Sequence, residues 1–349
     1  MNNSYVYTLD IKKIEKDING KNILITGGTG SFGKKMIQIL LAHFMPNKIV
    51  VLSRDEYKQY LMRKLFNDER IRYLLGDIRD YNRLQDAFKD IDVIFHAAAL
   101  KQVPATEYNP LEAIKTNIYG SENVIRAAIF NNVTKVIAIS TDKCVNPINL
   151  YGATKLCSER LFTNANIMSG KNGTIFSVLR YGNVLGSRGS VIPVFVEQKK
   201  TGTLTITDPK MTRFTITLQD AIHFVLFSMS IMLGGEVFVP KLPSYDIMQL
   251  ANVIAPECDK KIIGIRPGEK LHEKMVSEDE AYNTIDCDNF YVIKPFQNDY
   301  FSQKYDEYYT GNYKGKNVPD EYSYTSGDND LIKNELLKSM IDYNIGKKV

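Results

Sequence analysis

The chain has 349 residues, of which 44% are hydrophobic and 24% are charged, and its formal net charge is only +4. This length allows one large domain or two modest ones, and the composition is ordinary for a globular protein with a full core. Because acidic and basic residues are interspersed, the charge argues against nucleic-acid binding, although it allows a mildly basic cleft for an anionic ligand.

The cysteines and histidines argue against a metal centre. There are four of each, and the cysteines, at positions 144, 157, 258 and 287, form no Cys-x-x-Cys pair. Scattered cysteines are typical of a reducing compartment. The first residues contain no apolar run of signal-peptide length, and the sequence has no run of about 18 apolar residues. We therefore expect a cytoplasmic protein with no metal ion and no membrane partner.

From residue 22 onward, short apolar runs alternate with segments of helical periodicity. The expected strands cover residues 22–26, 48–52, 71–75, 92–99, 135–140 and 174–182. The expected helices cover residues 34–44, 55–66 and 81–89, and two more begin near Leu111 and Tyr151. Short buried strands that alternate with helices predict a parallel sheet with helices on both faces. The expected fold class is α/β, with a Rossmann-type doubly wound sheet.

The pattern loosens after residue 186. Helices are expected over 193–200 and 218–229 and strands over 204–207 and 236–240, which indicates a smaller C-terminal α/β domain for a substrate. Residues 296–330 are rich in Tyr, Asp, Asn and Gly and lack periodicity. We expect them to form an ordered arm or loop, which either packs on the surface or contributes to an oligomer contact.

A glycine-rich stretch, TGGTGSFG (residues 26–33), follows the first expected strand and opens the first expected helix. Gly27 permits a tight turn, Gly30 lets the backbone approach a pyrophosphate, and Gly33 allows close contact between helix and strand. The helix N-terminus offers free N–H groups and a partial positive charge to the phosphates. The pattern predicts dinucleotide binding, and the alternative is a tight turn without a ligand.

The end of the second strand indicates which dinucleotide is bound. An NAD site usually places an acidic residue there, but this chain has Ser53 and Arg54 and only then Asp55. A hydroxyl group and a guanidinium group suit a 2′-phosphate, so the sequence favours NADP. Asp77, after the third strand, could accept a hydrogen bond from the adenine amino group or merely cap the next helix.

Tyr151 and Lys155 form a Tyr-x-x-x-Lys pair at the start of a helix. The same spacing occurs elsewhere in the chain, but this pair follows the strand 135–140, at the sheet edge where the glycine loop would hold a nicotinamide. A spacing of four residues puts both side chains on one helical face. A cationic Lys155 would lower the pKa of Tyr151, so that Tyr151 could act as a base toward a hydroxyl group.

Longer motifs add a family resemblance. The segments TGGTGSFG, HAAALKQVP, STDK, YGATK and RYGNVLGSRGS resemble the extended short-chain dehydrogenase/reductase superfamily. The segments SRDEYKQ, TDKCVNPINLYGATKLCSE, MTRFTIT and IRPGEKLHE are similar to those of its inverting UDP-N-acetylglucosamine 4,6-dehydratases, which begin bacterial pseudaminic acid and capsule-sugar pathways. The resemblance runs from about Asn22 to Glu273, with a fainter likeness in VPDEYSYTS.

The resemblance implies a reaction in which C4 of the sugar is oxidised, water is lost across C5–C6, and hydride returns to C6. Tyr151 would take the proton of the C4 hydroxyl group, and NADP would take the hydride. Asp142 would protonate the departing C6 hydroxyl group, and Lys143 would be the base at C5. Thr141 would bond the substrate at O4, or else cap the turn. Retaining relatives have Asp-Glu where this chain has Asp-Lys, so the resemblance implies inversion at C5.

These roles require unusual ionisation states, because Asp142 has to arrive protonated and Lys143 neutral. Burial raises the pKa of a carboxyl group and lowers that of an amine, so it acts in the required direction on both residues. A direct ion pair between them would oppose both changes. We expect such pairing to be limited, because adjacent residues on an extended segment point in opposite directions. The alternative for both residues is a solvated turn after the strand.

The glycine loop and the resemblance together assign two sets of binding residues. The expected cofactor residues are Gly27, Thr29, Gly30, Ser31, Phe32, Gly33, Ser53, Arg54, Asp55, Lys58, Asp77, Ile78, Ala97, Lys101, Tyr151 and Lys155. The expected substrate residues are Lys101, Thr141, Asn183, Arg188, Val191, Arg213, Arg266 and Glu269. We expect His96 to pack near the cofactor and Cys144 only to pack.

The expected division has an N-terminal extension (residues 1–20), an NADP-binding Rossmann domain (21–185) and a substrate-binding domain with a C-terminal arm (186–349). A strand near 236–239 is a candidate to return to the Rossmann domain. The implied partner is UDP-N-acetylglucosamine, and the implied assembly is a homo-oligomer. Two other functions stay open. A sugar-nucleotide epimerase needs no acid–base pair for water loss, and a non-enzymatic NADP-binding regulator usually lacks the Tyr or the Lys.

Overall fold

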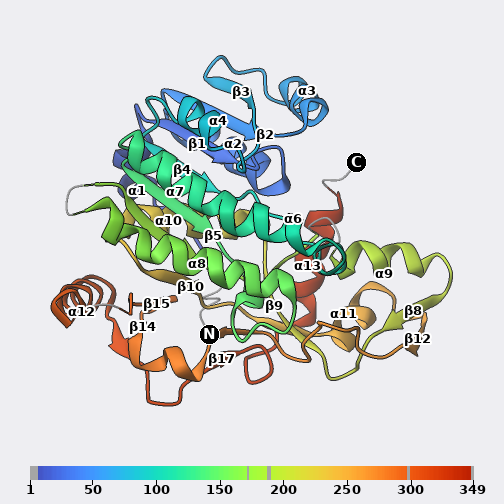
Figure 1. The fold of residues 1–349 in the computed structure, drawn as a ribbon. Coiled ribbons are helices and arrows are strands. Elements are labelled where there is room, and N and C mark those ends of the chain that lie inside the picture. The colour runs from blue at the N-terminus through green and yellow to red at the C-terminus, as the bar shows by residue number, and fades with distance from the viewer. Residues whose placement is uncertain (1–6, 171–172, 187–189, 297–298, 347–349) are drawn as a thin grey trace.

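A sheet of ten strands runs through the larger part of the molecule (Figure 1), of which a computed structural model describes residues 7–170, 173–186, 190–296 and 299–346. Its seven parallel strands lie in the spatial order β3 (Ile71–Leu75), β2 (Lys48–Ser53), β1 (Asn22–Thr26), β4 (Val93–His96), β5 (Lys135–Ile139), β6 (Ile175–Leu179) and β10 (Val237–Pro240). Three antiparallel strands continue it: β15 (Phe290–Ile293), β14 (Thr284–Asp286) and β16 (Lys316–Asn317).

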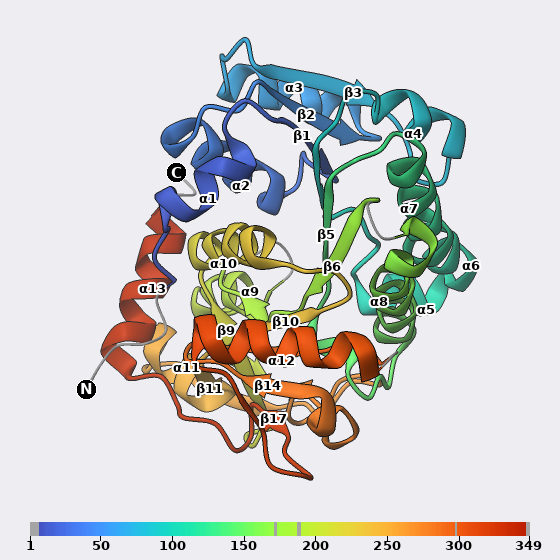
Figure 2. The ribbon, with the colours of Figure 1, turned by 90° about the vertical axis from the view of Figure 1, so that its left-hand side faces the viewer.

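Helices cover both faces of this sheet, because its central strands are apolar on both sides. Figure 2 shows α2 and α10 on one side of β5 and β6, and α7 and α8 on the other. The first face carries α1 (Ile11–Ile18), α2 (Ser31–His43), α3 (Glu56–Leu65), α10 (Leu218–Ile231) and α12 (Asp299–Tyr313). The second face carries α4 (Tyr81–Ala87), α7 (Gly120–Phe130) and α8 (Leu150–Ser169). The predicted Rossmann-type doubly wound α/β fold is confirmed.

A smaller lobe has a core of its own and lies away from β1–β3 (Figure 1). Its elements are β7 (Asn183–Val184), α9 (Val191–Lys199), β8 (Thr203–Ile206), β9 (Thr212–Ile216), β11 (Ser244–Asp246), α11 (Ile247–Ile254), β12 (Asp259–Ile262) and α13 (Asn334–Gly346). Phe195, Leu204, Leu250 and Leu337 are fully or almost fully buried in it. The strands β13 (Lys274–Val276) and β17 (Tyr324–Thr325) pair with each other, and Met275, Val276 and Tyr324 pack in a core of the sheet region.

The structure differs from the sequence-based expectation in two segments. The helix expected from Leu111 is preceded by α5 (Val103–Tyr108) and consists of α6 (Pro110–Ile114), a π-helical stretch (Lys115–Tyr119) and α7. Residues 296–330, expected to form an ordered arm or loop because they lack periodicity, contain helix α12 over 299–313, which the sequence pattern did not indicate. Tyr305 and Tyr309, four residues apart on α12, are both buried, and the Tyr309 hydroxyl donates to Glu236 Oε1 at 3.0 Å.

Residues beyond 186 contribute to both parts of the molecule. Helix α10 packs on the Rossmann sheet, and β10 lies beside β6 in it, whereas β8, β12 and α11 belong to the smaller lobe. We propose a division in which the substrate-binding part is built from separate stretches of the chain. Among the described residues, no helix has both the length and the apolar character that crossing a bilayer requires.

Candidate active site

The candidate site lies at the carboxyl edge of the parallel strands. The strand order places β1 between β2 and β4, because the chain runs from β1 outward to β2 and β3 and then crosses to β4, β5 and β6 on the other side. Open α/β sheets bind ligands at such a switch point. The register brings Thr26 of β1 opposite His96 of β4, and His96 opposite Ala138 of β5. The glycine loop, Ala97 and the segment that follows β5 therefore meet at this edge.

The glycine loop has the geometry that its sequence predicts. Gly27 has a φ of +65°, and a Cβ there would lie 3.0 Å from backbone atoms of Ala98. A Cβ on Gly33 would lie 2.1 Å from the Gly28 carbonyl oxygen, so only glycine allows α2 to approach β1 this closely. Gly30 is the N-cap of α2 and offers no side-chain cap, so the first N–H groups of the helix are available to an anion. Thr29, Ser31 and Phe32 belong to the same loop and first turn.

Charged side chains surround the end of β2. Arg54 Nη1 lies 3.7 Å from Asp77 Oδ2, and Lys58 Nζ lies 2.6 Å from Asp55 Oδ2. Asp55 also caps α3, because its Oδ1 accepts from the Lys58 N–H at 2.9 Å. Burial would raise the pKa of Asp77, but Arg79 and Arg54 hold it below its ordinary value, so Asp77 is an ionised partner of two guanidinium groups.

The predicted site residues Ser53 and Ile78 are buried close to this group. Ser53 is the last residue of β2, and its hydroxyl accepts from Gln59 Nε2 at 3.0 Å. A Cβ on Gly120 would lie 2.7 Å from Ile78, so Ile78 fills the space between the end of β3 and α7. The structure therefore gathers the residues predicted for the adenosine end at one position on the sheet edge.

The segment after β5 forms a turn of 3-10 helix over Asp142–Cys144 instead of extended backbone. Lys143 Nζ consequently donates to Asp142 Oδ1 at 3.0 Å, and the Thr141 hydroxyl donates to the same oxygen at 2.9 Å. The expectation that the two residues point apart is wrong, because the chain leaves the strand at Ile139 and turns tightly. Asp142 is 1% exposed, and burial is the main cause that raises its pKa, as predicted.

Lys143 has a second acidic neighbour. Its Nζ lies 3.3 Å from Oε1 of Glu273, whose side chain is only 3% exposed, and 3.5 Å from Asn183 Oδ1. Burial would lower the pKa of Lys143, but the charges of Asp142 and Glu273 raise it overall. The prediction of a lowered Lys143 pKa is therefore wrong for the chain itself. Sequence reasoning did not single out Glu273, although it ends the motif IRPGEKLHE.

Tyr151 and Lys155 both lie on the buried side of α8, as their spacing predicts. Burial raises the pKa of Tyr151 to about 12, against the charge of Lys143 and a hydrogen bond with Thr141. Burial lowers the pKa of Lys155 to about 8, and its Nζ donates to the Ile139 carbonyl oxygen at 2.8 Å. The prediction that Lys155 lowers the Tyr151 pKa is not met in the chain alone, because desolvation dominates there.

Helix α8 lies unusually close to the Asp142–Cys144 turn. A Cβ on Gly152 would lie 2.1 Å from the Lys143 carbonyl oxygen. Asn149, the N-cap of α8, accepts from the Gly152 N–H at 2.8 Å and donates to the Gly268 carbonyl oxygen at 2.8 Å. This capping joins the start of α8 to the loop that carries Arg266 and Glu269.

The residues predicted to hold the substrate fall into three groups. Asn183 and Arg213 lie in the cluster around Lys143, but Arg213 donates to the carbonyl oxygens of Thr212, Lys270 and Leu271 and so holds the loop before Glu273. Lys101 is exposed as a whole residue, but its amine is partly covered. This burial, and then the charge of Lys143, lower the pKa of Lys101. Arg266 and Glu269 form the second group, and Val191 and Arg188 the third.

Arg266 and Glu269 form the second group, on the loop beside Asn149. Arg266 Nη1 lies 3.8 Å from Glu269 Oε1, and the Arg266 side chain is 62% exposed, so it is accessible to a ligand. Val191 begins α9 and packs partly on the core of the smaller lobe. Arg188 lies outside the described residues.

His96 and Cys144 line the buried side of the site. The Thr26 hydroxyl accepts from the N–H groups of Ala97 and Ala98, so its own proton goes to His96 Nδ1 at 2.8 Å. Burial lowers the pKa of His96 to about 3. Burial raises the pKa of Cys144 to about 12, and its thiol donates to the Thr141 carbonyl oxygen at 2.8 Å. Both residues therefore pack as neutral groups.

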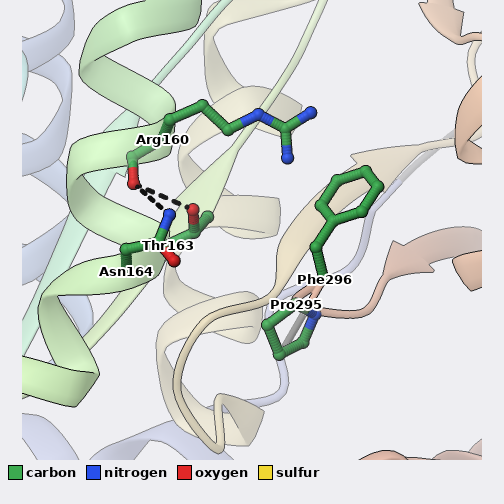
Figure 3. Close-up of a pocket in the computed structure, with 5 residues that line it drawn as sticks. All are labelled: Arg160, Thr163, Asn164, Pro295 and Phe296. Carbon is green, nitrogen blue, oxygen red and sulfur yellow. Dashed lines mark hydrogen bonds between the residues drawn. The ribbon is translucent and has the colours of Figure 1, made fainter. Parts of the chain in front are cut away.

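Two neighbouring cavities, which share Arg160 and Phe296 in their linings, do not include Tyr151, Lys143 or the glycine loop. The smaller one, about 200 Å³, is lined by Arg160, Thr163, Asn164, Pro295 and Phe296. Figure 3 shows the Arg160 guanidinium group extended toward the Phe296 ring, and its central carbon lies 4.2 Å from the ring centroid. The larger one, about 680 Å³, lies next to it and reaches Cys144. In the described part of the chain, no cluster of His, Cys, Asp and Glu could hold a metal ion.

Comparisons with known proteins identify the family to which the chain belongs. A family model described as "Polysaccharide biosynthesis protein" matches residues 23–295. A relative from Campylobacter jejuni, named UDP-N-acetylglucosamine 4,6-dehydratase (inverting), is 51% identical over 332 residues, which are 93% of this chain and 97% of the relative. A relative from Rickettsia bellii, named UDP-glucose 4-epimerase, is 46% identical over 285 residues, which are 78% of this chain and 82% of the relative.

A solved structure, that of Pen from Bacillus thuringiensis, superimposes with a TM-score of 0.83 at 38% identity and covers 95% of this chain and 99% of its own. The predicted resemblance to inverting UDP-N-acetylglucosamine 4,6-dehydratases is confirmed by the Campylobacter relative. From the family match and these identities, the chain belongs to the polysaccharide biosynthesis protein family.

Proposed function

We propose that the chain catalyses the NADP-dependent dehydration of UDP-N-acetylglucosamine with inversion at C5, to UDP-2-acetamido-2,6-dideoxy-β-L-arabino-hex-4-ulose. The observation that carries the proposal is the pair of buried Asp142 and partly exposed Lys143 close to Tyr151, in a chain that is 51% identical to a named enzyme of this activity. Removing water across a C–C bond requires a proton donor and a base at the same sugar, and this pair holds both 3.0 Å apart.

The glycine loop and the end of β2 fit a nicotinamide dinucleotide. A Cβ on Gly30 would meet only the Gly27 carbonyl oxygen, at 3.2 Å, so the outer side of the loop is open to a pyrophosphate, next to the uncapped helix N-terminus. Ser53, Arg54 and Lys58 supply a hydroxyl group and two cations for a 2′-phosphate. When bound, the nicotinamide would accept hydride from C4 of the sugar and return it to C6.

Tyr151 takes the proton of the C4 hydroxyl group. Its pKa of about 12 is too high for an efficient base near neutral pH, so it depends on neighbouring positive charge and hydrogen bonds that stabilise the phenolate. The charge of Lys143 and a hydrogen bond with Thr141 both lower the Tyr151 pKa, against the burial that raises it. Lys155 lies one helical turn further on, where it can hold a ribose hydroxyl group of the cofactor.

Asp142 and Lys143 carry out the elimination. The ketone at C4 acidifies the C5 proton, which neutral Lys143 removes, and protonated Asp142 gives its proton to the departing C6 hydroxyl group. The Thr141 hydroxyl donates to Asp142 Oδ1 and so fixes the carboxyl group. Burial of Asp142 favours its protonated form, as the acid role requires.

Lys101, Asn183, Arg213, Arg266 and Glu269 are proposed to hold the sugar nucleotide, together with Arg188 and Val191. The cations suit the diphosphate, and exposed Arg266 with partly buried Glu269 suits the uridine ribose. We further propose that the enzyme works in the cytoplasm as a homo-oligomer, without a nucleic-acid or membrane partner. Its product would enter a bacterial surface-sugar pathway, such as pseudaminic acid, capsule or O-antigen synthesis.

Epimerisation is the second candidate, because relatives named UDP-glucose 4-epimerase are 46% identical to this chain. An epimerase needs a base such as Tyr151 and a cofactor, but it needs no acid and base for water loss. The Asp142–Lys143 pair therefore favours dehydration. The mass of the product separates the two, because it falls by one water for a dehydratase and stays unchanged for an epimerase.

The test is incubation with UDP-N-acetylglucosamine and NADP in heavy water, followed by NMR spectroscopy and mass spectrometry of the product. We expect loss of one water, deuterium at C5 and the L-arabino configuration. Lys143→Glu should lose most turnover and keep NADP binding, whereas Lys210→Glu, at an exposed lysine of the smaller lobe, should keep both. Undiminished dehydration by Lys143→Glu would remove Lys143 from the mechanism.

A further inference from the structure

Glu273 lies between two positively charged side chains in the interior of the site. It comes immediately before β13, and its Oε1 lies 3.3 Å from Lys143 Nζ and 3.9 Å from Arg213 Nε. Its side chain is 3% exposed, and among the described residues its Oε2 has no hydrogen-bond partner. Burying a carboxylate is costly unless it is paired, so Lys143 and Arg213 determine where this group can lie.

The backbone of Glu273 is fixed independently of its side chain. Its N–H donates to the Ser326 hydroxyl oxygen at 2.9 Å, and its carbonyl oxygen accepts from the Ser326 N–H at 2.8 Å. The Ser326 hydroxyl also lies 2.8 Å from Thr212 Oγ1, on the strand that carries Arg213. Three segments of the chain thus fix the backbone position from which the Glu273 side chain reaches Lys143.

Lys143 is consequently shared by two buried acids, Asp142 at 3.0 Å and Glu273 at 3.3 Å. The acids have different surroundings. Glu273 faces the cations Arg213 and Lys143, whereas Asp142 accepts hydrogen bonds from the Thr141 hydroxyl group and from Lys143. Two nearby carboxyl groups whose environments differ in this way differ in their affinity for a proton. Glu273 keeps the negative charge, which lies close to both members of the reacting pair.

We propose that Glu273 is a positioning residue that holds the Lys143 amine beside Asp142 and sets the pH range in which Asp142 gives a proton and Lys143 takes one. This inference rests on the proposed dehydration. A negative charge makes its neighbours bind protons more tightly, whether they are acids or amines. Glu273 therefore moves the working range of the whole pair toward higher pH.

Burial has the largest effect on the pKa values of Asp142 and Lys143, and their mutual contact comes next. The charge of Glu273 then raises both pKa values. The Glu273 pKa itself is lowered overall, because Lys143, Arg213 and Lys270 outweigh the burial that would raise it. The other titratable or charged groups that face the pair are Tyr151, Tyr245, Lys101, Lys270, Arg213 and Cys144. None of them is removed by a substitution at Glu273.

The first test is the pH dependence of kcat in Glu273→Gln, which keeps the shape of the side chain and removes its charge. One charge within a few ångströms moves a pKa by about 1–3 units, so both limbs of the profile should move to lower pH by about one unit or more. The matched control is Glu278→Gln, at an exposed residue of the next segment that pairs with Lys274, and its profile should stay in place. A Glu273→Gln profile that coincides with that of the natural protein would overturn the proposal.

A second measurement needs no turnover. Acetic anhydride is reacted with the whole protein at a series of pH values, and acetylated Lys143 is quantified by mass spectrometry. Glu273→Gln should shift the onset of Lys143 acetylation to lower pH, and an unchanged onset would refute the proposed charge effect. If Glu273→Gln does not fold, Arg213→Gln removes a positive charge from the same group and should shift the onset to higher pH; no shift there would equally refute it. If the natural protein releases no dehydrated product while the onset still moves, the dehydratase proposal fails, and only the effect of the Glu273 charge on the Lys143 amine stands.

Discussion

Replacing Gly152 by alanine tests whether the packing of α8 on the Asp142–Cys144 turn positions the catalytic pair. The added Cβ would lie 2.1 Å from the Lys143 carbonyl oxygen and 3.0 Å from Pro147 Cβ. Carbon–oxygen contacts in proteins are about 3.3 Å or longer, so the turn and the helix have to separate by about 1.2 Å. Both neighbours are backbone or proline atoms, so no flexible side chain can absorb the displacement.

The expected effect on catalysis is large, because Lys143 itself carries the carbonyl group that must move. Misplacing a reacting group by about 1 Å lowers a rate by about 10²-fold. We therefore expect kcat to fall by about that factor, which corresponds to about 2.7 kcal/mol in the activation free energy. Overpacking of this kind also lowers the free energy of unfolding by about 1–3 kcal/mol.

The assay combines steady-state kcat for UDP-N-acetylglucosamine, NADP binding by fluorescence and the free energy of unfolding in urea. The matched control is Gly311→Ala in α12, where a Cβ meets nothing within 4 Å and φ is not positive. That variant should keep its activity and gain up to about 1 kcal/mol, since alanine favours helix more than glycine does. A Gly152→Ala protein with natural kcat would refute the link between this contact and catalysis.

Three further predictions concern single side chains. The free energy of unfolding should fall by about 2 kcal/mol between pH 8 and pH 5, because His96 is neutral in the folded protein, with a pKa lowered from 6.5 to about 3, and protonates on unfolding; His96→Gln should remove this part of the slope. Arg180→Leu should cost about 3–5 kcal/mol in urea unfolding, because it leaves the buried carboxylates of Glu159 and Glu280 without their shared cation. Arg54→Ala should weaken NADP binding, measured by fluorescence titration, more than NAD binding, and an unchanged preference would remove Arg54 from the 2′-phosphate site.

Local patterns were enough to predict the glycine loop and the start of α8. Gly27, Gly30 and Gly33 act within eight residues of sequence, and the strand before them and the helix after them are each recognisable from their own periodicity. Tyr151 and Lys155 are likewise related by one helical turn. Their relative placement follows from the regular geometry of a helix, so no distant contact is needed to predict it.

The contacts of the acid–base pair could not be predicted in this way. Lys143 and Glu273 are 130 positions apart, and only the folded loop before β13 brings them to 3.3 Å. The ion pair between Asp142 and Lys143 depends on where β5 ends, and strand ends are the least certain part of a sequence-based prediction. The helix α12 was missed because its buried positions are tyrosines, whose polar hydroxyl groups conceal an apolar face.

The ion pair between Asp142 and Lys143 is compatible with the elimination that it was expected to oppose. The proton that Asp142 needs is on the Lys143 amine, and its transfer along the 3.0 Å hydrogen bond yields a carboxylic acid and a neutral amine without any change in total charge. The Lys143 side chain is still 25% exposed, so a bound sugar would remove solvent from the ammonium group. Lower polarity disfavours the charged forms of both groups. In the proposed mechanism, a site covered by the sugar would therefore favour the neutral acid and base at the stage of water loss, after the charged Lys143 has assisted Tyr151 at the C4 hydroxyl group.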